Sequence, residues 1–292
     1  MYRSLLFIPA DSDKKIAKAE SIPADLIILD LEDAVAAEAR PEAREKALRY
    51  LKSPRRDGGS ARFIRVNPAD SDDFEKDLEA VMAGAPDGIV LPKAHAPDDI
   101  LVLGARLSKY ENALRLEARS TRILPVATET PKALFSLGEY AKVNERLAGL
   151  TWGAEDLGAA VGALSKKGEA GEWSDPFALA RSLCLFAASS AGVPAIDTLY
   201  ADFRDDEGLA ASARRARRDG FTGKLAIHPA QVETINAAFT PEPEEIAEAQ
   251  AIIDLFAANP RAGALSYKGR MVDWPHLVQA RKIVALAERA GN

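Results

Sequence analysis

The chain has 292 residues, of which 47% are hydrophobic and 28% are charged, and its formal net charge is −6. This composition argues against a disordered or fibrous chain, and the acidic balance argues against nucleic acid or an anionic membrane as a partner. No run approaches eighteen uninterrupted apolar residues, and the chain enters a strand-like run directly. We therefore expect a cytoplasmic protein without a membrane segment.

Short apolar runs rich in isoleucine, valine and leucine recur through the first part of the chain. They span residues 4–9, 25–30, 61–67, 88–93, 122–129, 149–156, 193–198 and 223–229. Such continuous apolarity is typical of strands buried on both faces of a parallel sheet. The stretches between them have helical composition and spacing. Eight strand–helix units predict an α/β fold, a TIM (β/α)8 barrel, with a doubly wound open sheet as the alternative.

We divide the chain into a barrel at residues 1–235 and a C-terminal helical extension at residues 236–292. The segment FTPEPEEIAEAQAIIDLFAANP predicts a helix that begins at a proline. The next segment, AGALSYKGRMVDWP, predicts a loop that turns at Lys268 and Gly269, and HLVQARKIVALAERAGN predicts a final helix. The extension is expected to pack on the barrel or on a neighbouring subunit.

Cys184 is the single cysteine, so the chain has no internal disulfide and suits a reducing compartment. Its apolar helical context predicts a small core residue rather than a nucleophile. The basic run RRARR at residues 214–218 predicts the solvated face and carboxyl end of a helix, where cations suit the helix dipole.

In a TIM barrel the active site is built at the carboxyl ends of the strands, so the polar residues there are candidates. They are Asp30, Glu32, Asp33, Arg65, Asn67, Lys93, Glu129, Glu155, Asp156, Asp197 and His228. The amino-terminal ends of the same runs are plainer. This asymmetry predicts that charged groups converge at one end of the barrel.

The fifth and sixth runs end in acids, Glu129 in one and Glu155 with Asp156 in the other. Neighbouring strands would direct these side chains into one mouth, where two carboxylates repel unless one is protonated or a cation lies between them. An all-oxygen site suits Mg²⁺, with Mn²⁺ as a substitute, whereas three scattered histidines do not suit zinc. Alternatively, the acids only cap the helices that follow. Spacing alone leaves both interpretations open.

Arg65 ends a buried strand, and a buried arginine needs an anion. Glu32 and Asp33 on the preceding run are the expected orienting partners. The anion is then a substrate carboxylate held in a bidentate fork, or else a structural acid.

Lys93 has three possible roles at its strand end: a Schiff base with a ketone, an anion site or a pair with a neighbouring acid. His228 precedes Pro229 and suits either a base or a satisfied core histidine.

Eight segments stand in chain order: RSLLFIPA, ILDLEDAV, FIRVN, LPKA, ATETPKAL, WGAEDLGA, GKLAIHPAQV and GRMVD. Together they resemble the citrate lyase β-subunit-like group of CoA-ester lyases, part of the HpcH/HpaI aldolase/citrate lyase superfamily. The resemblance runs from Arg3 to the final predicted helix, and eight motifs in order are highly specific. One departure is Ala10 after Pro9, where glycine is usual; it affects a backbone turn and not the chemistry.

The resemblance implies a TIM barrel assembled as a homotrimer or hexamer, with the C-terminal segment reaching over a neighbour. It implies Mg²⁺ held by Glu129 and Asp156, and a substrate oxoacid bound by Arg65. It also implies that Asp273 is supplied to the adjacent subunit as the acid/base. From spacing alone, Asp273 suits equally well the N-cap of a helix beginning at Trp274.

The resemblance further implies that Glu32 and Asp33 line the site near Arg65. The phosphates of coenzyme A would meet basic residues near the first strand–helix loop, with Lys14 and Lys18 as candidates.

The expected function is Mg²⁺-dependent cleavage of a 3-hydroxyacyl-CoA, such as malyl-CoA or citramalyl-CoA. The products would be acetyl-CoA and a 2-oxoacid, glyoxylate or pyruvate, formed by reversible Claisen-type chemistry. Three alternatives stay open: a citrate lyase β subunit acting on a citryl-acyl carrier protein, a metal-independent Schiff-base aldolase acting through Lys93, and a binding protein without activity. Hydrolysis of the thioester is also compatible with the same residues.

Overall fold

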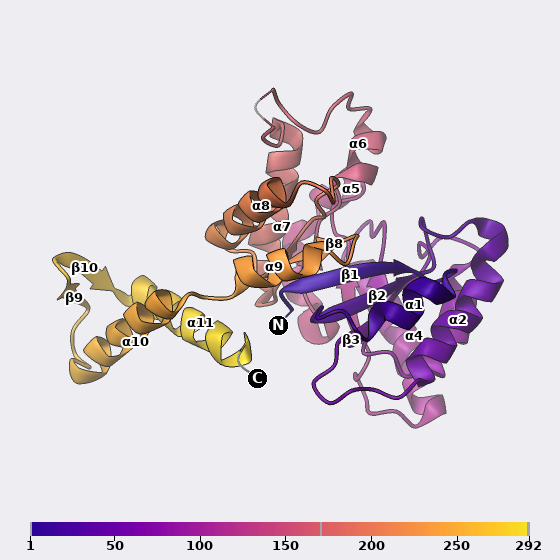
Figure 1. Ribbon diagram of the computed structural model, residues 1–292, viewed down its shortest axis with the longest axis horizontal. Coiled ribbons are helices and arrows are strands. Elements are labelled where there is room, and N and C mark those ends of the chain that lie inside the picture. Colours follow the sequence, from indigo (N-terminus) through magenta and orange to yellow (C-terminus); the bar gives the residue numbers. More distant parts are fainter. Residues whose placement is uncertain (1, 170, 291–292) are drawn as a thin grey trace.

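The computed structural model describes residues 2–169 and 171–290. Within them, eight parallel strands form one sheet in the order β5-β4-β3-β2-β1-β8-β7-β6 (Figure 1). The strands are β1 Ser4–Pro9, β2 Leu26–Asp30, β3 Ala61–Arg65, β4 Gly88–Leu91, β5 Arg122–Pro125, β6 Leu150–Thr151, β7 Ala195–Asp197 and β8 Gly223–Ala226. Each of the eight predicted runs therefore contains a strand.

Backbone contacts between β5 and β6 close the sheet into a barrel. The N–H of Ala127 donates to the carbonyl of Thr151 at 2.8 Å, and the N–H of Ala148 donates to the carbonyl of Ile123 at 2.8 Å. The TIM-barrel prediction is confirmed, and the open doubly wound sheet is wrong. Glu129 follows β5 and Asp156 follows β6, so the closure of the barrel brings these two strand ends side by side.

The barrel interior is filled by side chains from alternate positions of the strands, as the pleat requires. This inner core contains Leu5, Leu26, Ile28, Phe63, Val90, Leu124, Val126, Ile196 and Leu225. Gly88 makes room for it, because a Cβ there would lie 2.3 Å from the ring of Phe63. Since this layer is packed, ligands have access only to the ends of the barrel.

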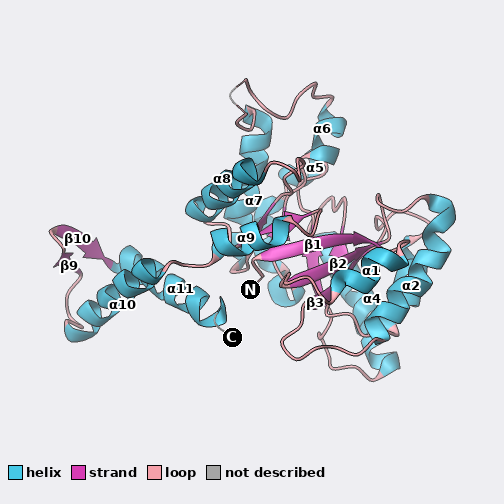
Figure 2. Cartoon of the chain, in the orientation of Figure 1, coloured by secondary structure: helices cyan, strands magenta, loops and turns pink. Residues whose placement is uncertain are grey.

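Helices surround the sheet and bury its outer face (Figure 2). They are α1 Asp13–Ala19, α2 Arg40–Lys52, α3 Phe74–Met82, α4 Asp98–Leu114, α5 Pro131–Leu134, α6 Glu155–Val161, α7 Asp175–Ala191, α8 Asp206–Asp219 and α9 Gln231–Phe239. Short 3₁₀ turns span Ala37–Ala39, Leu137–Lys142 and Asn144–Arg146. Cys184 is buried in α7, as predicted, and the basic run forms the last turns of α8.

The extension comprises α10 Pro243–Ala258, β9 Ala264–Tyr267, β10 Arg270–Asp273 and α11 Trp274–Ala290. Figure 1 shows it standing off the barrel, on the side where β1 begins. It has a small core of its own around Phe256, Val272 and Leu277. The predicted boundary at residue 235 falls within α9, which packs on the barrel.

The segment predicted as a loop is instead an antiparallel hairpin, β9 with β10. Its turn is at Lys268 and Gly269, as expected, and both residues have positive φ, 47° and 77°. Two consecutive positive φ values suit a tight hairpin turn whose twist matches that of its strands. In the described residues no helix is long and apolar enough to cross a membrane. The cytoplasmic location stays a prediction.

Candidate active site

Arg65 ends β3, and its guanidinium lies at the carboxyl end of the barrel against two acids. Its Nε and Nη2 donate to the two carboxylate oxygens of Asp30 at 2.7 and 2.6 Å. Its Nη1 lies 3.0 Å from Oε2 of Glu32, and its guanidinium carbon lies 4.8 Å from the centre of the Phe7 ring. Burial alone would lower the pKa of Arg65, but the bonds and charges of these acids raise it overall. The guanidinium of Arg65 therefore carries a fixed positive charge at the carboxyl end of the barrel, which we call the mouth.

Asp33 is not a partner of Arg65, contrary to the prediction. Asp30 takes that place, because it shares the inward face of β2 with Leu26 and Ile28. The Asp33 side chain is 57% exposed and lies beside Lys93 instead. The other predicted partner, Glu32, is 2% exposed and does contact Arg65.

Lys93 follows β4, and its ammonium lies among three acids. It forms an ion pair with Glu32, and Nζ lies 3.3 Å from Oδ2 of Asp33 and 3.4 Å from Oδ1 of Asp156. Burial opposes the charged form, yet these carboxylates raise the pKa of Lys93 overall. A protonated lysine cannot attack a carbonyl, so the arrangement argues against the Schiff-base alternative.

Glu129 lies beyond the end of β5 and is 5% exposed. One oxygen accepts a hydrogen bond from the backbone N–H of Lys93 at 2.5 Å. Burial raises the pKa of Glu129 to about 8, and the charges of Asp156 and Glu32 add to the rise, against the Lys93 bond and the charge of Arg65. A buried acid with this titration is typical of a functional site.

A tight contact between the loops after β5 and β6 positions Glu129. A Cβ on Gly153 would lie 2.6 Å from Cγ of Glu129, so only glycine allows this approach. The N–H of Gly153 donates to Oγ1 of buried Thr128 at 3.1 Å. Neither Thr128 nor Gly153 is among the residues predicted for the site. The sequence indicates these two residues only by placing them next to the acidic motifs.

Asp156 and its neighbour Glu155 have different surroundings. Asp156 approaches Lys93 and interacts with Glu129 through its charge. Glu155 is 53% exposed and pairs with Lys166. Neither acid is a helix cap, because α6 begins at Glu155 after Ala154, which makes no side-chain cap. Thr130, and not Glu129, caps α5.

The donor set at the mouth fits a magnesium ion. Among the described residues no three histidine, cysteine or acidic side chains form a ready-made metal cage. Mg²⁺ is commonly held by one or two carboxylates and completed by water and substrate oxygens, and Glu129 and Asp156 offer two. The mouth also has more acidic than basic groups, because five carboxyl groups face only Arg65 and Lys93 among its described side chains. A divalent cation would offset most of the excess negative charge that these acids carry when ionised.

Three other polar strand-end residues form no hydrogen bond or ion pair with Arg65, Lys93 or the acids of the mouth in the described part of the chain. Asn67 points outward and bonds to Asp77 at 2.8 Å. Asp197 is buried behind the sheet, where Lys224 donates to it at 2.7 Å. His228 is exposed, so it is not a core histidine, and its ring is stacked 4.7 Å from that of Phe203.

Lys14 and Lys18 lie on α1, directly after β1, and both are exposed. Neither forms an ion pair within the described part of the chain, so both are free to meet an anion.

Asp273 ends β10, immediately before α11, and its Oδ1 lies 2.6 Å from Nδ1 of His276. Figure 1 places this hairpin far from the carboxyl end of β1. Asp273 therefore does not join the mouth of its own chain.

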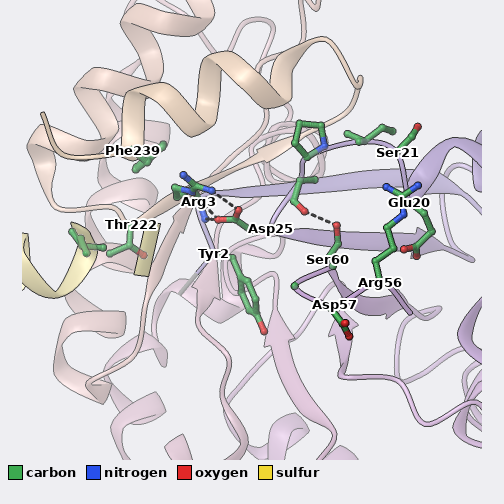
Figure 3. Close-up of a pocket in the computed structure, with 16 residues that line it drawn as sticks. Tyr2, Arg3, Glu20, Ser21, Asp25, Arg56, Asp57, Ser60, Thr222 and Phe239 are labelled. Atoms are coloured by element: carbon green, nitrogen blue, oxygen red, sulfur yellow. Dashed lines mark hydrogen bonds and ion pairs between the residues drawn. The ribbon is translucent and has the colours of Figure 1, made fainter. Parts of the chain in front are cut away.

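A cavity of about 600 Å³ lies at the opposite end of the barrel (Figure 3). Tyr2, Arg3 and Asp25 line it beside the start of β1, and Leu286 of α11 borders it. Arg3 and Asp25 satisfy each other at 2.8 Å. The acids and Arg65 are at the other end, which is where barrel enzymes do their chemistry.

A TIM barrel with buried acids, an arginine and a lysine at the carboxyl ends of its strands has the arrangement of a barrel enzyme. The chain belongs to the HpcH/HpaI aldolase/citrate lyase family, whose model matches residues 3–229. A second model, for a C–C bond lyase of the TIM-barrel fold, matches residues 182–291.

Known relatives are similar over nearly the whole chain. The mitochondrial citramalyl-CoA lyase of Rattus norvegicus is 33% identical over 98% of this chain and 86% of its own length. The citrate lyase subunit beta of Escherichia coli K12 is 33% identical over 99% of this chain and 94% of its own. A crystal structure of CitE from Mycobacterium tuberculosis with magnesium, acetoacetate and coenzyme A matches with a TM-score of 0.79 and 33% identity, covering 98% of each chain. The protein is a lyase of this family.

Proposed function

We propose that the protein is a Mg²⁺-dependent lyase that cleaves a 3-hydroxyacyl-CoA, such as malyl-CoA or citramalyl-CoA. The products are acetyl-CoA and a 2-oxoacid, glyoxylate or pyruvate. The observation that carries the proposal is that Glu129 and Asp156 both contact Lys93 at the barrel mouth, where Lys93 shares Glu32 with Arg65. The relatives named citramalyl-CoA lyase and the CitE structure with magnesium and coenzyme A support it.

The residues at the mouth suit the steps of this cleavage. A base takes the proton of the substrate hydroxyl, and that oxygen becomes the carbonyl of the oxoacid as the C–C bond breaks. The carbon next to the thioester carbonyl keeps the electron pair as an enolate and must gain a proton. A divalent cation held by Glu129 and Asp156 would supply Lewis-acid polarisation of the substrate oxygens. Arg65, fixed by its two bonds to Asp30, offers positive charge to the carboxylate or carbonyl of the oxoacid.

We propose that Asp273 of a neighbouring subunit gives the proton to the enolate carbon, next to the thioester carbonyl. The β9–β10 hairpin that carries Asp273 lies far from the active site of its own chain. A carboxyl group on a projecting hairpin can instead reach the active site of a neighbouring subunit. Met271 and Trp274 flank Asp273 and are 66% and 62% exposed, which suits contact with another subunit. A homotrimer or hexamer would bring each hairpin to a neighbouring mouth.

Lys14 and Lys18 are proposed to meet the phosphates of coenzyme A. They are exposed cations on the helix that follows β1, and coenzyme A carries several negative charges. A citryl-acyl carrier protein substrate stays an alternative, since the relative from Escherichia coli is a citrate lyase subunit beta.

The direct test is an assay with malyl-, methylmalyl-, citramalyl- and citryl-CoA, each with and without EDTA. We expect release of acetyl-CoA and an oxoacid from at least one thioester, and loss of the reaction with EDTA. Release of free coenzyme A without an oxoacid would indicate a thioesterase. Inactivity on all four thioesters would overturn the proposal.

Asp156→Asn and Glu155→Gln form a matched pair of variants, because each removes one of two adjacent charges. We expect Asp156→Asn to lose most Mg²⁺ binding and at least about a hundredfold in kcat, since its carboxylate is a proposed metal ligand. Glu155→Gln should stay within about twofold, because exposed pairs contribute little. Equal losses in the two variants would contradict the assignment of the metal to Asp156.

A further inference from the structure

Lys93 stands where the negative charge of the mouth is densest. Its Nζ contacts Glu32, Asp33 and Asp156, and its side chain is 28% exposed. Arg65, the other cation of this cluster, is occupied by Asp30 and Glu32. Among the described residues, Lys93 is therefore the cation that faces Asp156.

The backbone of Lys93 is held in an unusual conformation at this position. Its φ is +51°, an unusual conformation for a residue with a side chain, which the surrounding structure must stabilise. Its N–H donates to Glu129, so the same residue contacts both proposed metal ligands, one through its backbone and one through its ammonium. The strand end thus binds Glu129 through its backbone and places its positive charge beside Asp156.

We propose that Lys93 is a built-in counter-ion that competes with the divalent cation for Asp156. In the metal-free protein its ammonium partly balances that carboxylate. When the cation binds, the ammonium leaves Asp156 and keeps its contacts with Glu32 and Asp33. Lys93 thereby sets how tightly the site holds its metal. The inference rests on the proposed function, because it takes Glu129 and Asp156 as the metal ligands.

Two physical points support this competition. An ammonium and a divalent cation on one carboxylate repel each other strongly at the few ångströms that separate them, especially where water is partly excluded. The flexible stem of lysine also lets its ammonium move without moving the backbone, whereas the planar guanidinium of Arg65 is held by a bidentate pair. Of the two cations at the mouth, Lys93 is thus the one whose charged group can move away when a metal ion binds.

The test uses Lys93→Met, which keeps the length of the side chain and removes its charge. Lys166→Met is the matched control, because Lys166 pairs with Glu155 next to Asp156 but does not face the mouth. Titration calorimetry with Mg²⁺ and electron paramagnetic resonance with Mn²⁺ measure binding without substrate. We expect Lys93→Met to bind about tenfold more tightly and Lys166→Met to stay within about twofold of wild type.

Unchanged or weaker metal binding by a folded Lys93→Met protein would overturn the inference, because Lys93 would then organise the acids rather than compete. A second measurement needs no variant: crystal structures of the wild type with and without Mn²⁺. We expect the 3.4 Å contact between Lys93 and Asp156 to be lost in the metal-bound form. If it persists beside the bound ion, the inference fails. Wild type that binds neither ion would instead overturn the metal site of the proposed function.

Discussion

Glu129 shows how burial sets the chemistry of a single carboxyl group. Two acidic strand-end motifs are visible in the sequence, but the surroundings that raise the pKa of Glu129 to about 8 are not. Burial is the first cause, and the charges of Asp156 and Glu32 add to it. In the metal-free protein the neutral form is favoured. The contribution of Glu129 to the free energy of unfolding is complete below its ordinary pKa of 4.5 and is lost as the pH rises towards 8.

Metal affinity should follow the opposite trend with pH. Glu129 must lose its proton before it can bind a cation, so we expect the Kd for Mg²⁺ to fall by nearly tenfold per unit between about pH 6 and 8, then level off. Calorimetry at four pH values, in two buffers of different ionisation enthalpy, measures both the affinity and the proton released. The variant Glu129→Gln should bind weakly with little change across this range. A flat wild-type profile from pH 6 to 8 would contradict the prediction.

Single residues can be predicted from the sequence to different degrees. Arg65 is placed correctly at the mouth, because a cation at the end of a buried strand must face an anion there. Its main partner, Asp30, is not predicted, although the alternation of β2 assigns it the inward face. Asp197 fits the same strand-end rule but lies behind the sheet with Lys224. Which face an acid occupies depends on register at the last residue of a strand, where the apolar pattern ends.

At the scale of elements, apolar runs locate the strands but not their lengths. The run at 149–156 contains only Leu150–Thr151 as strand, and α6 begins at Glu155. Gly153 lies between them and cannot continue a regular strand, because its loop must let Glu129 approach. The hairpin in the extension escapes prediction for another reason: its turn is predicted at Lys268 and Gly269, but its two strands are short and largely exposed, so they lack the apolar run of a buried strand.

The loops that follow β5 and β6 are joined by one side chain that positions both proposed metal ligands. The hydroxyl of Thr128, one residue before Glu129, accepts the N–H of Gly153, three residues before Asp156. Thr128→Val keeps the shape and leaves that N–H without its partner. We expect a loss of stability of about 1–3 kcal/mol and weaker Mg²⁺ binding by severalfold. Thermal unfolding and calorimetry with Mg²⁺ measure the two effects.

The matched control is Thr151→Val, one strand further along the same barrel. The Thr151 hydroxyl is buried and donates to the carbonyl of Ile196 at 3.0 Å, so it joins β6 to β7 rather than β5 to β6. A similar loss of stability is expected, with Mg²⁺ affinity unchanged. If both variants lose metal affinity equally, the effect comes from general loosening of the barrel and not from the Thr128 contact.

At the scale of the whole molecule, the barrel follows from local pattern, whereas the place of the extension does not. Eight apolar runs separated by helices have few alternative arrangements, and the predicted barrel is confirmed. The extension buries only a small core of its own and leaves Met271 and Trp274 exposed. In the proposed assembly its place depends on surfaces of other subunits, which no pattern within one chain specifies.

Mixing two inactive variants tests whether Asp273 serves a neighbouring mouth. Asp273→Ala and Arg65→Ala should each lose most activity, since one removes the proposed acid and the other the oxoacid site. In a mixed trimer, some sites combine an intact Arg65 from one subunit with an intact Asp273 from another. Random assembly of equal amounts makes that true of about a quarter of the sites, so about a quarter of wild-type activity should return.

The control for this experiment is a mixture of Arg65→Ala with Asp156→Ala. Both side chains belong to the same barrel mouth, where each contacts the cluster around Glu32 and Lys93. Each site in the mixture then lacks one or the other, and no activity should return, although the subunits exchange equally well. Recovery in the first mixture and not in the second would establish that Asp273 acts across an interface. No recovery in either, with exchange confirmed by mass spectrometry, would confine Asp273 to a role within its own chain, where it precedes α11 and contacts His276.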